Sequence, residues 1–273
     1  MSNRQLIGEM LAIVRVRTGV DFESYREPTL ERRIESRMAS VGLARREDYL
    51  HLLERSEAEA AQLLERITIK VSRFYRHPPT FDLLREQVMP RLAALGRPVR
   101  AWSAGCGRGE EAYTLAMLLD EASIAGSVEA TDIDSGALQW ARAGVYADEA
   151  AAELPKALRE RYLEPVPGPR AARWRVREPL RERVRFSRGD LNQPDAAAAL
   201  APFDLVCCRN VLIYWLPPVQ VRLLQHLSAA VAREGYLCLG EAEWPLPPAG
   251  AALEPLAPNA RVFRTAGRAA EAA

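Results

Sequence analysis

The stretch VRAWSAGCGRGEEAYTLAM, residues 99–117, decides how the larger part of this chain folds. It begins with a short apolar run, typical of a buried strand, that ends at Ala104. Glycines follow at positions 105, 107 and 109, and a helical pattern begins near Glu110. Glycines at alternate positions let the backbone turn tightly and approach a ligand closely. The stretch therefore predicts a strand, a ligand-binding glycine loop and a helix, in that order.

The first helical residues, Glu110 and Glu111, indicate which ligand suits this loop. In a dinucleotide-binding loop the pyrophosphate sits on the helix N-terminus, where backbone N–H groups and the helix dipole attract an anion. Two carboxylates at that place repel a pyrophosphate, but they suit the dipole and a cationic or hydroxyl-rich ligand. The pair favours a nucleoside without phosphates, such as S-adenosylmethionine, over NAD. The plainer interpretation is a glycine-rich turn before an ordinary acidic first turn.

The segment EATDID, residues 129–134, ends the next expected strand and offers a second ligand contact. An acidic residue at the position of Asp132 accepts hydrogen bonds from both ribose hydroxyls of a bound nucleoside. Asp134, with Ser135 beside it, is expected to cap the following helix. An aspartate at a strand end means little by itself, but after a glycine loop it indicates a nucleoside site.

The segment FDLVCCRNVLIYW, residues 203–215, predicts a central strand because it is so apolar. Arg209 and Asn210 interrupt the run, and polar groups at the carboxyl end of a central strand lie beside the ligand crevice of such a sheet. Tyr214 would place a hydroxyl at the mouth of that crevice. The alternative is an arginine that snorkels at the strand end and a tyrosine that belongs to the core.

The chain divides into a helical first part and an alternating second part. We expect a helical domain over residues 1–76, a linker with a connecting helix over 77–98, and an α/β domain over 99–268. Alternating strands and helices after residue 98 predict a mostly parallel sheet with helices on both faces. Between residues 145 and 185 the short runs RWRVR and RVRFS suit an inserted subdomain of small antiparallel strands.

Composition excludes several classes of protein. The 37 Lys and Arg residues balance 36 Asp and Glu residues, so the basic excess of a general nucleic-acid or membrane binder is missing. No run of about 18 apolar residues predicts a membrane span, and the N-terminus lacks the pattern of a signal peptide. No pair of cysteines has metal-ligand spacing, so we expect free thiols, no metal and a cytoplasmic location. The four cysteines are Cys106, Cys207, Cys208 and Cys238.

Together these stretches resemble the CheR family of chemotaxis receptor methyltransferases. The resemblance covers residues 5–265. It implies an α/β fold class: a small N-terminal all-helical domain, then a class I S-adenosylmethionine-dependent methyltransferase (Rossmann-like) domain with a small antiparallel β subdomain inserted. It rests on these blocks, which occur in the order of the family: LERRIESRM, ITIKVSRFYRHPPTF, RAWSAGCGRGEEAYTLAM, ATDIDSGALQWARAGVY, FDLVCCRNVLIYW and GYLCLGEAE.

The resemblance also implies a reaction and the residues that perform it. S-adenosylmethionine would donate a methyl group to glutamate side chains of chemoreceptor signalling helices and leave S-adenosylhomocysteine. Arg76 would orient the acceptor carboxylate with its planar guanidinium, and Tyr214 would lie near the transferred methyl group. The implied enzyme is a cytoplasmic monomer. The residues implied to bind the cofactor are Lys70, Ser72, Arg76, Gly105, Glu111, Asp132, Asp190, Leu191, Arg209 and Asn210.

Some positions depart from the family pattern. The linker usually reads T-x-N-x-T-x-F-x-R, but Lys70 replaces its asparagine and Ser72 its second threonine, and Arg108 and Asp190 are also unusual. A cofactor-binding module without catalytic activity is therefore the alternative function. A methyltransferase for nucleic acid is disfavoured because no N/D-P-P-Y motif is present.

Segment 28–46 carries five arginines against two glutamates, which suits either an acidic receptor or a solvated charged face.

Overall fold

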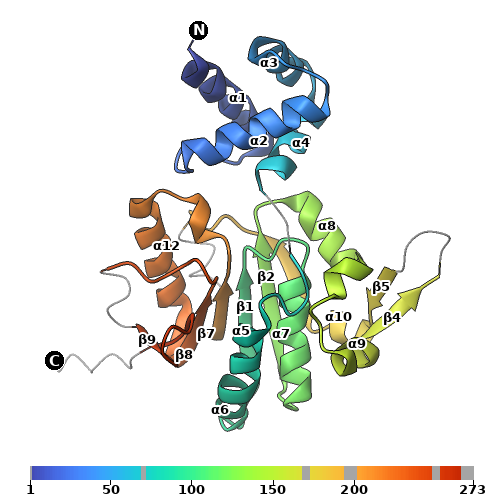
Figure 1. Cartoon of the computed structure of the whole chain (residues 1–273). Helices are drawn as coiled ribbons and strands as arrows, with labels where there is room; N and C mark the ends of the chain where they lie inside the picture. The colour runs from blue at the N-terminus through green and yellow to red at the C-terminus, as the bar shows by residue number, and fades with distance from the viewer. Residues whose placement is uncertain (1, 69–71, 168–172, 194–201, 248–252, 266–273) are drawn as a thin grey trace. The chain divides into compact units, whose positions relative to one another are not determined.

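The computed structural model describes residues 2–68, 72–167, 173–193, 202–247 and 253–265 (Figure 1). The chain forms two compact units. The first contains the chain up to residue 70 together with residues 214–219, and the second contains the remainder. The first unit is therefore discontinuous in sequence.

The N-terminal unit is built from four helices whose starts follow from the sequence. Ser2 caps the first helix in a capping box with Gln5, and Gly19 ends it in a left-handed conformation. The Ser56 hydroxyl accepts a hydrogen bond from the backbone N–H of Glu59 at 3.1 Å and caps the fourth. The helices are α1 (Asn3–Thr18), α2 (Glu27–Ser40), α3 (Arg46–Arg55) and α4 (Glu57–Ile67).

A buried ion pair holds three of these helices together. Arg37 of α2 donates two hydrogen bonds to the carboxylate of Glu59 on α4, at 2.8 and 2.7 Å, and the Tyr49 hydroxyl of α3 donates a third at 2.8 Å. Arg46 contacts Glu31 and Glu35 of α2. Glu31 and Glu35 are already in the count for segment 28–46, so only the Arg37–Glu59 pair reduces its basic excess further, by one charge.

Residues 214–219 complete this unit although they follow a strand of the other one. The ring of Trp215 lies 4.4 Å from that of Tyr25, and these two residues form an isolated β-bridge. The backbone N–H of Arg26 donates to the carbonyl of Tyr214 at 2.9 Å. Trp215 is buried, so its ring supplies apolar area that helices α1–α4 alone do not provide.

The Arg37–Glu59 pair gives a first prediction. Burial raises the pKa of Glu59, but hydrogen bonds from Arg37 and Tyr49 outweigh it and lower the pKa overall. Breaking a buried pair leaves an uncompensated charge, so Arg37→Ala should lower the free energy of unfolding at pH 7 by about 3 kcal/mol. A lowered carboxyl pKa stabilises the fold above the unfolded pKa, and this contribution is lost as the pH falls. The variant's deficit should therefore shrink at pH 4.

Urea unfolding at pH 7 and pH 4 measures this effect. The exposed Arg32→Ala, on the same helix, is the matched control. If both variants lose the same stability at both pH values, the buried pair does not stabilise the unit.

The second unit contains a seven-stranded sheet in the order β6-β2-β1-β7-β8-β10-β9. The first five strands pair in parallel, and β10 and β9 are antiparallel. This confirms the mostly parallel sheet. The bounds are β1 (Val99–Ala104), α7 (Glu110–Glu121), β2 (Gly126–Asp132), α8 (Ser135–Ala143), β6 (Val184–Arg188), β7 (Phe203–Cys208), η3 (Leu212–Tyr214), α12 (Pro217–Ala230), β8 (Val231–Leu239), β9 (Leu253–Pro255) and β10 (Val262–Thr265).

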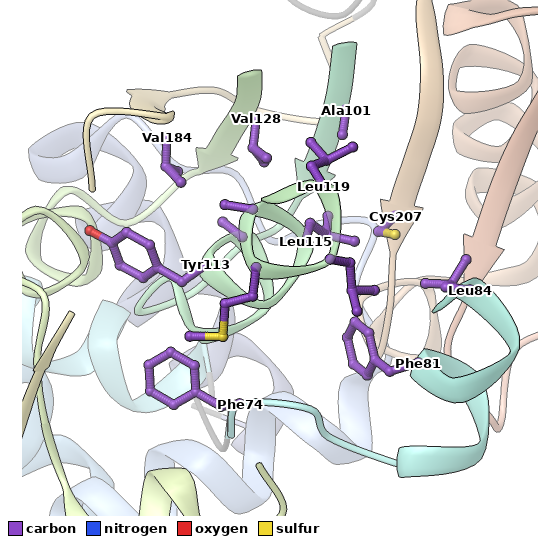
Figure 2. Close-up of a cluster of buried hydrophobic side chains, with 14 of the residues drawn as sticks. Phe74, Phe81, Leu84, Ala101, Tyr113, Leu115, Leu119, Val128, Val184 and Cys207 are labelled. Carbon is purple, nitrogen blue, oxygen red and sulfur yellow. The ribbon is translucent and has the colours of Figure 1, made fainter. Parts of the chain in front are cut away.

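Helix α7 lies on the core of this unit. In Figure 2 its side chains Tyr113, Leu115 and Leu119 pack among apolar side chains of β1, β2, β6 and β7. Every residue of β7 is buried, as expected for a central strand. The register aligns the carboxyl ends of β1, β2 and β7, since Ser103 lies opposite both Ala130 and Cys207. The loops that follow these strands therefore meet at one edge of the sheet.

The small antiparallel subdomain is present, but one of the strands predicted for it belongs to the large sheet instead. Its three strands are ordered β3-β5-β4, with η2 and α9 between β3 and β4. The run RVRFS was expected there and this was wrong, because β6 pairs in parallel with β2 at the edge of the large sheet. The elements are β3 (Val145–Ala147), η2 (Asp148–Ala151), α9 (Lys156–Tyr162), β4 (Leu163–Val166), β5 (Arg173–Val176) and α10 (Glu178–Arg181).

The connecting helix contains a widened turn. It runs through α5 (Pro78–Leu83), the π-helical η1 (Leu84–Val88) and α6 (Met89–Ala93). Pro90 has no N–H to donate to the carbonyl four residues earlier, and the N–H of Met89 reaches back five residues to Leu84 instead. Phe81 and Leu84 still point into the core beside α7 (Figure 2).

Candidate functional site

The glycine loop between β1 and α7 has no room for a side chain at Gly105 or Gly109. Gly105, Gly107 and Gly109 all have positive φ angles, of 76°, 55° and 93°. A Cβ atom on Gly105 would lie 2.6 Å from the side chain of Val211, in the loop after β7. The loop can thus bring its backbone close to a ligand, as its sequence predicts.

Asp132 connects this loop to the end of β2. Its carboxylate accepts hydrogen bonds from the N–H groups of Gly107 at 2.8 Å and of Asp134 at 2.9 Å. The Asp134 carboxylate accepts from Gly136 and Ala137 and caps α8, which confirms the predicted cap. Asp132 therefore sits where the first two loops of the sheet meet.

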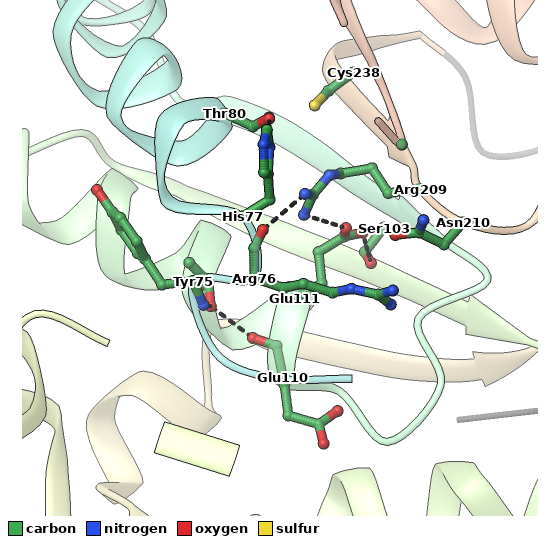
Figure 3. A network of polar contacts seen from close by, with 12 residues as sticks. Tyr75, Arg76, His77, Thr80, Ser103, Glu110, Glu111, Arg209, Asn210 and Cys238 are labelled. Carbon is green, nitrogen blue, oxygen red and sulfur yellow. Dashed lines mark hydrogen bonds and ion pairs between the residues drawn. The ribbon is translucent and has the colours of Figure 1, made fainter. Parts of the chain in front are cut away.

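A buried pair of charges lies beneath the loops. The Glu111 carboxylate accepts a hydrogen bond from the Ser103 hydroxyl at 2.7 Å, and Arg209 approaches its other oxygen at 3.5 Å (Figure 3). Only 3% of the Arg209 side chain is exposed. Burial raises the pKa of Glu111, although Arg209 and Ser103 counteract it. The pair joins β1, α7 and the end of β7, and both members were predicted site residues.

The linker is fixed to the same place through its backbone. Arg209 donates a hydrogen bond at 2.7 Å to the carbonyl of Arg76, and the N–H of Tyr75 donates to the Thr114 hydroxyl of α7 at 3.1 Å (Figure 3). Tyr75 and His77, on either side of Arg76, have positive φ angles of 57° and 63°. Such angles cost energy in residues with a Cβ, so surrounding contacts must hold them. The backbone of Arg76 is therefore fixed by its neighbours and by Arg209.

The structure brings some of the other predicted residues together. Ser72 hydrogen-bonds to the Glu110 carboxylate on α7. The turn after β6 carries Asp190 and Leu191, and its Gly189 N–H donates to the carbonyl of Asp132 at 3.1 Å. Asn210 has a left-handed conformation directly after Arg209.

The remaining predicted residues are Lys70 and Tyr214. Lys70 lies outside the described residues. Tyr214 is grouped with the N-terminal unit, where its carbonyl accepts the hydrogen bond from Arg26. Its expected place near the transferred methyl group stays a prediction.

Sequence reasoning missed two buried carboxylates. Glu243 accepts hydrogen bonds from five backbone N–H groups of the loops after β7 and β8. Glu110 was predicted to suit the helix dipole and a cationic or hydroxyl-rich ligand, but its burial was not predicted, and it is only 4% exposed. The sole signal for Glu243 was its place in the block GYLCLGEAE, since nothing local to the sequence shows which amides a carboxylate will meet.

Comparison with known families decides the assignment. A family model described as "CheR methyltransferase, SAM binding domain" matches residues 70–246. A second, "CheR methyltransferase, all-alpha domain", matches residues 7–68. The chain belongs to the CheR family. This confirms the fold class, an all-helical domain before an S-adenosylmethionine-binding methyltransferase domain with a small antiparallel sheet, and it confirms the cofactor.

Several CheR relatives are longer than this chain. It is 36% identical over 248 residues to an uncharacterized 104.1 kDa protein of Rhodobacter capsulatus, which covers 88% of this chain and 25% of that one. It is 30% identical to "Probable biofilm formation methyltransferase WspC" of Pseudomonas aeruginosa, over 85% of this chain and 55% of that one. It is 33% identical to "Chemotaxis protein methyltransferase 2" of the same organism, over 83% of this chain and 81% of that one. The chain thus spans a quarter to about half of the first two.

The site residues fit S-adenosylmethionine. The cofactor carries hydroxyl groups, an ammonium group and a sulfonium but no phosphate. Carboxylates at Glu111 and Asp132 would repel a phosphate and attract those groups. The backbone hydrogen bonds from Gly107 and Asp134 hold the Asp132 carboxylate at the edge where the loops meet.

Two other properties concern the described residues only. No group of three or more His, Cys, Asp or Glu side chains in the described ranges is arranged to hold a metal ion. Over the same ranges, no helix combines the length and the apolar character that a membrane span requires.

All four cysteines are free and buried. Burial raises the pKa of the Cys106 thiol, which keeps it neutral and unreactive.

The burial of Glu110 gives a pH-dependent prediction. Burial raises its pKa to about 7, and the Ser72 hydroxyl and Arg108 offset only part of this. A carboxyl group whose pKa is raised on folding destabilises the fold as the pH rises from the unfolded pKa to the folded one. Glu110→Gln should therefore stabilise the protein at pH 8, by up to about 3 kcal/mol. It should have little effect at pH 5.

Urea unfolding of wild type and variant between pH 5 and pH 8 measures this. The exposed Glu149 in η2 provides the control Glu149→Gln. Equal stability changes at pH 5 and pH 8 would show that Glu110 does not titrate in this range.

Proposed function

We propose that this protein transfers the methyl group of S-adenosylmethionine to glutamate side chains of a bacterial receptor and forms methyl esters. The observation that carries the proposal is Arg76, whose backbone is fixed to the buried Glu111–Arg209 pair of a CheR methyltransferase domain. A guanidinium at that position suits a carboxylate acceptor, because its planar N–H groups match the two carboxylate oxygens.

The reaction needs orientation more than proton transfer. When bound, S-adenosylmethionine supplies a methyl group on a positively charged sulfur, which a carboxylate oxygen can take up as the carbon–sulfur bond breaks and its electron pair stays on sulfur. A glutamate side chain is already ionised at neutral pH, so no base has to remove a proton. The chain's task is to hold Glu111 and Asp132 toward the cofactor and Arg76 toward the acceptor. Fixing two reactants in this way supplies much of the rate enhancement.

The names of the relatives concern two processes. One relative is named a chemotaxis protein methyltransferase and another a probable biofilm formation methyltransferase. We favour methyl-accepting signalling helices as the acceptor, in line with the chemotaxis name and with the acceptor that the family resemblance implies. Four free buried thiols suit a reducing compartment, so we place the reaction in the cytoplasm.

Arg76→Ala tests the proposed role directly. Methyl-labelled S-adenosylmethionine is incubated with the protein and a fragment of a methyl-accepting receptor, and base-labile label is counted. Misplacing the acceptor should lower the rate about 100-fold. Binding of S-adenosylhomocysteine in calorimetry should weaken far less than the rate falls, because the backbone contact of residue 76 to Arg209 remains.

The matched control is the exposed Arg91→Ala in α6, which should turn over like the wild type. Unchanged turnover of Arg76→Ala would remove Arg76 from the reaction. Cofactor binding by the wild type without ester formation on any receptor fragment would favour the alternative, a cofactor-binding module without catalytic activity.

A further inference from the structure

Glu243 is a buried carboxylate that the reaction described above does not use. It follows β8 in the turn from Gly240, and 3% of it is exposed. Among the described residues, no lysine, arginine or histidine forms an ion pair with it. Burying an ionised carboxylate without a cation is costly unless hydrogen bonds replace its water shell. Its hydrogen-bond partners should therefore show which part of the fold this buried carboxylate stabilises.

Four of the five N–H partners of Glu243 are successive backbone amides of one loop. One carboxylate oxygen accepts from the N–H groups of Val211 at 2.8 Å, Leu212 at 2.7 Å and Ile213 at 3.4 Å. The other accepts from Asn210 at 2.9 Å and Gly240 at 2.6 Å. Consecutive N–H groups that converge on one anion form a backbone nest. The side chain thus acts as an internal anion that shapes the loop after β7, residues 210–213.

Two backbone features show that this loop is adapted to the carboxylate. Asn210 has a left-handed φ angle of 59°, which is costly for a residue with a side chain, and its N–H donates to Glu243. A Cβ atom on Gly240 would lie 2.6 Å from the N atom of Asn210 and 2.6 Å from the Glu243 carboxylate. Only glycine at position 240 lets the loop and the carboxylate approach so closely.

The loop shaped by Glu243 borders the cofactor site on two sides. Asn210 follows Arg209, whose guanidinium contacts Glu111 and the carbonyl of Arg76. The Val211 side chain lies against Gly105 of the glycine loop. A shift of the loop would therefore move Asn210 and change the space above Gly105.

We propose that Glu243 is a positioning residue for the cofactor. Its carboxylate fixes the loop 210–213 in the conformation that binds S-adenosylmethionine, so the site exists before the cofactor arrives. The inference rests on the proposed function only for its activity readout. Binding of S-adenosylhomocysteine tests it even if the acceptor has been misidentified.

Glu243→Gln keeps the size of the side chain but replaces one acceptor oxygen with an NH2 donor, which opposes the N–H groups facing it. We expect S-adenosylhomocysteine to bind about 10- to 100-fold more weakly in calorimetry, as when a supporting residue of a site is removed. Hydrogen exchange should accelerate at amides 210–213 and stay slow in α7. In turnover, KM for S-adenosylmethionine should rise, while KM for the receptor fragment should not.

Glu254→Gln is the matched control, since Glu254 is exposed on β9 and far from this loop in sequence. If Glu243→Gln fails to fold, Gly240→Ala decides the question, because its methyl group presses on both Asn210 and the carboxylate. Wild-type affinity with wild-type exchange at amides 210–213 in the folded variant would overturn the proposal. A loss of affinity that is fully explained by the unfolded fraction of the variant would overturn it as well.

Discussion

The position of the Arg209 guanidinium constrains most of the site. It lies at the carboxyl end of the central strand and contacts Glu111 of α7 and the carbonyl of Arg76. Its charge also lies 4.8 Å from the centre of the Phe81 ring on the connecting helix. One buried cation therefore connects the sheet, the helix after the glycine loop and the segment that enters the domain. Without it, Glu111 would be an unpaired buried charge, and the backbone of Arg76 would lose an anchor.

The protein buries its carboxylates in three different ways. Glu59 is paired with an arginine and a tyrosine, and its pKa falls. Glu110 and Glu111 have weaker compensation, and burial raises the pKa of both. Glu243 has no ionic partner within the part of the chain that the structure describes, and it relies on backbone amides. The first arrangement stabilises a fold. The other two occur around the loops that follow β1, β7 and β8, where we propose that the cofactor binds.

Local features of the site could be predicted from the sequence. The glycine loop, the cap at Asp134 and the buried strand at residues 203–208 each depend on a few adjacent residues, and the structure has them as expected. The strand at residues 184–188 was misassigned because its pairing with β2 is non-local, and an alternating run fits an antiparallel edge equally well. Charge counting overestimated the basic excess of segment 28–46 by one charge, because the partner of Arg37 is Glu59 of another helix.

The discontinuity of the N-terminal unit has a consequence for how the chain is made. Arg26 and Trp215 are joined by a hydrogen bond across 189 positions of sequence. Helices α1–α4 leave the ribosome first, but the tryptophan that covers Tyr25 is synthesised only after most of the sheet. Until residue 215 has been synthesised, the core of the helical unit therefore lacks the ring of Trp215. A fragment cut after α4 would keep that exposed apolar surface, so its behaviour would underestimate the stability of the same helices in the whole protein.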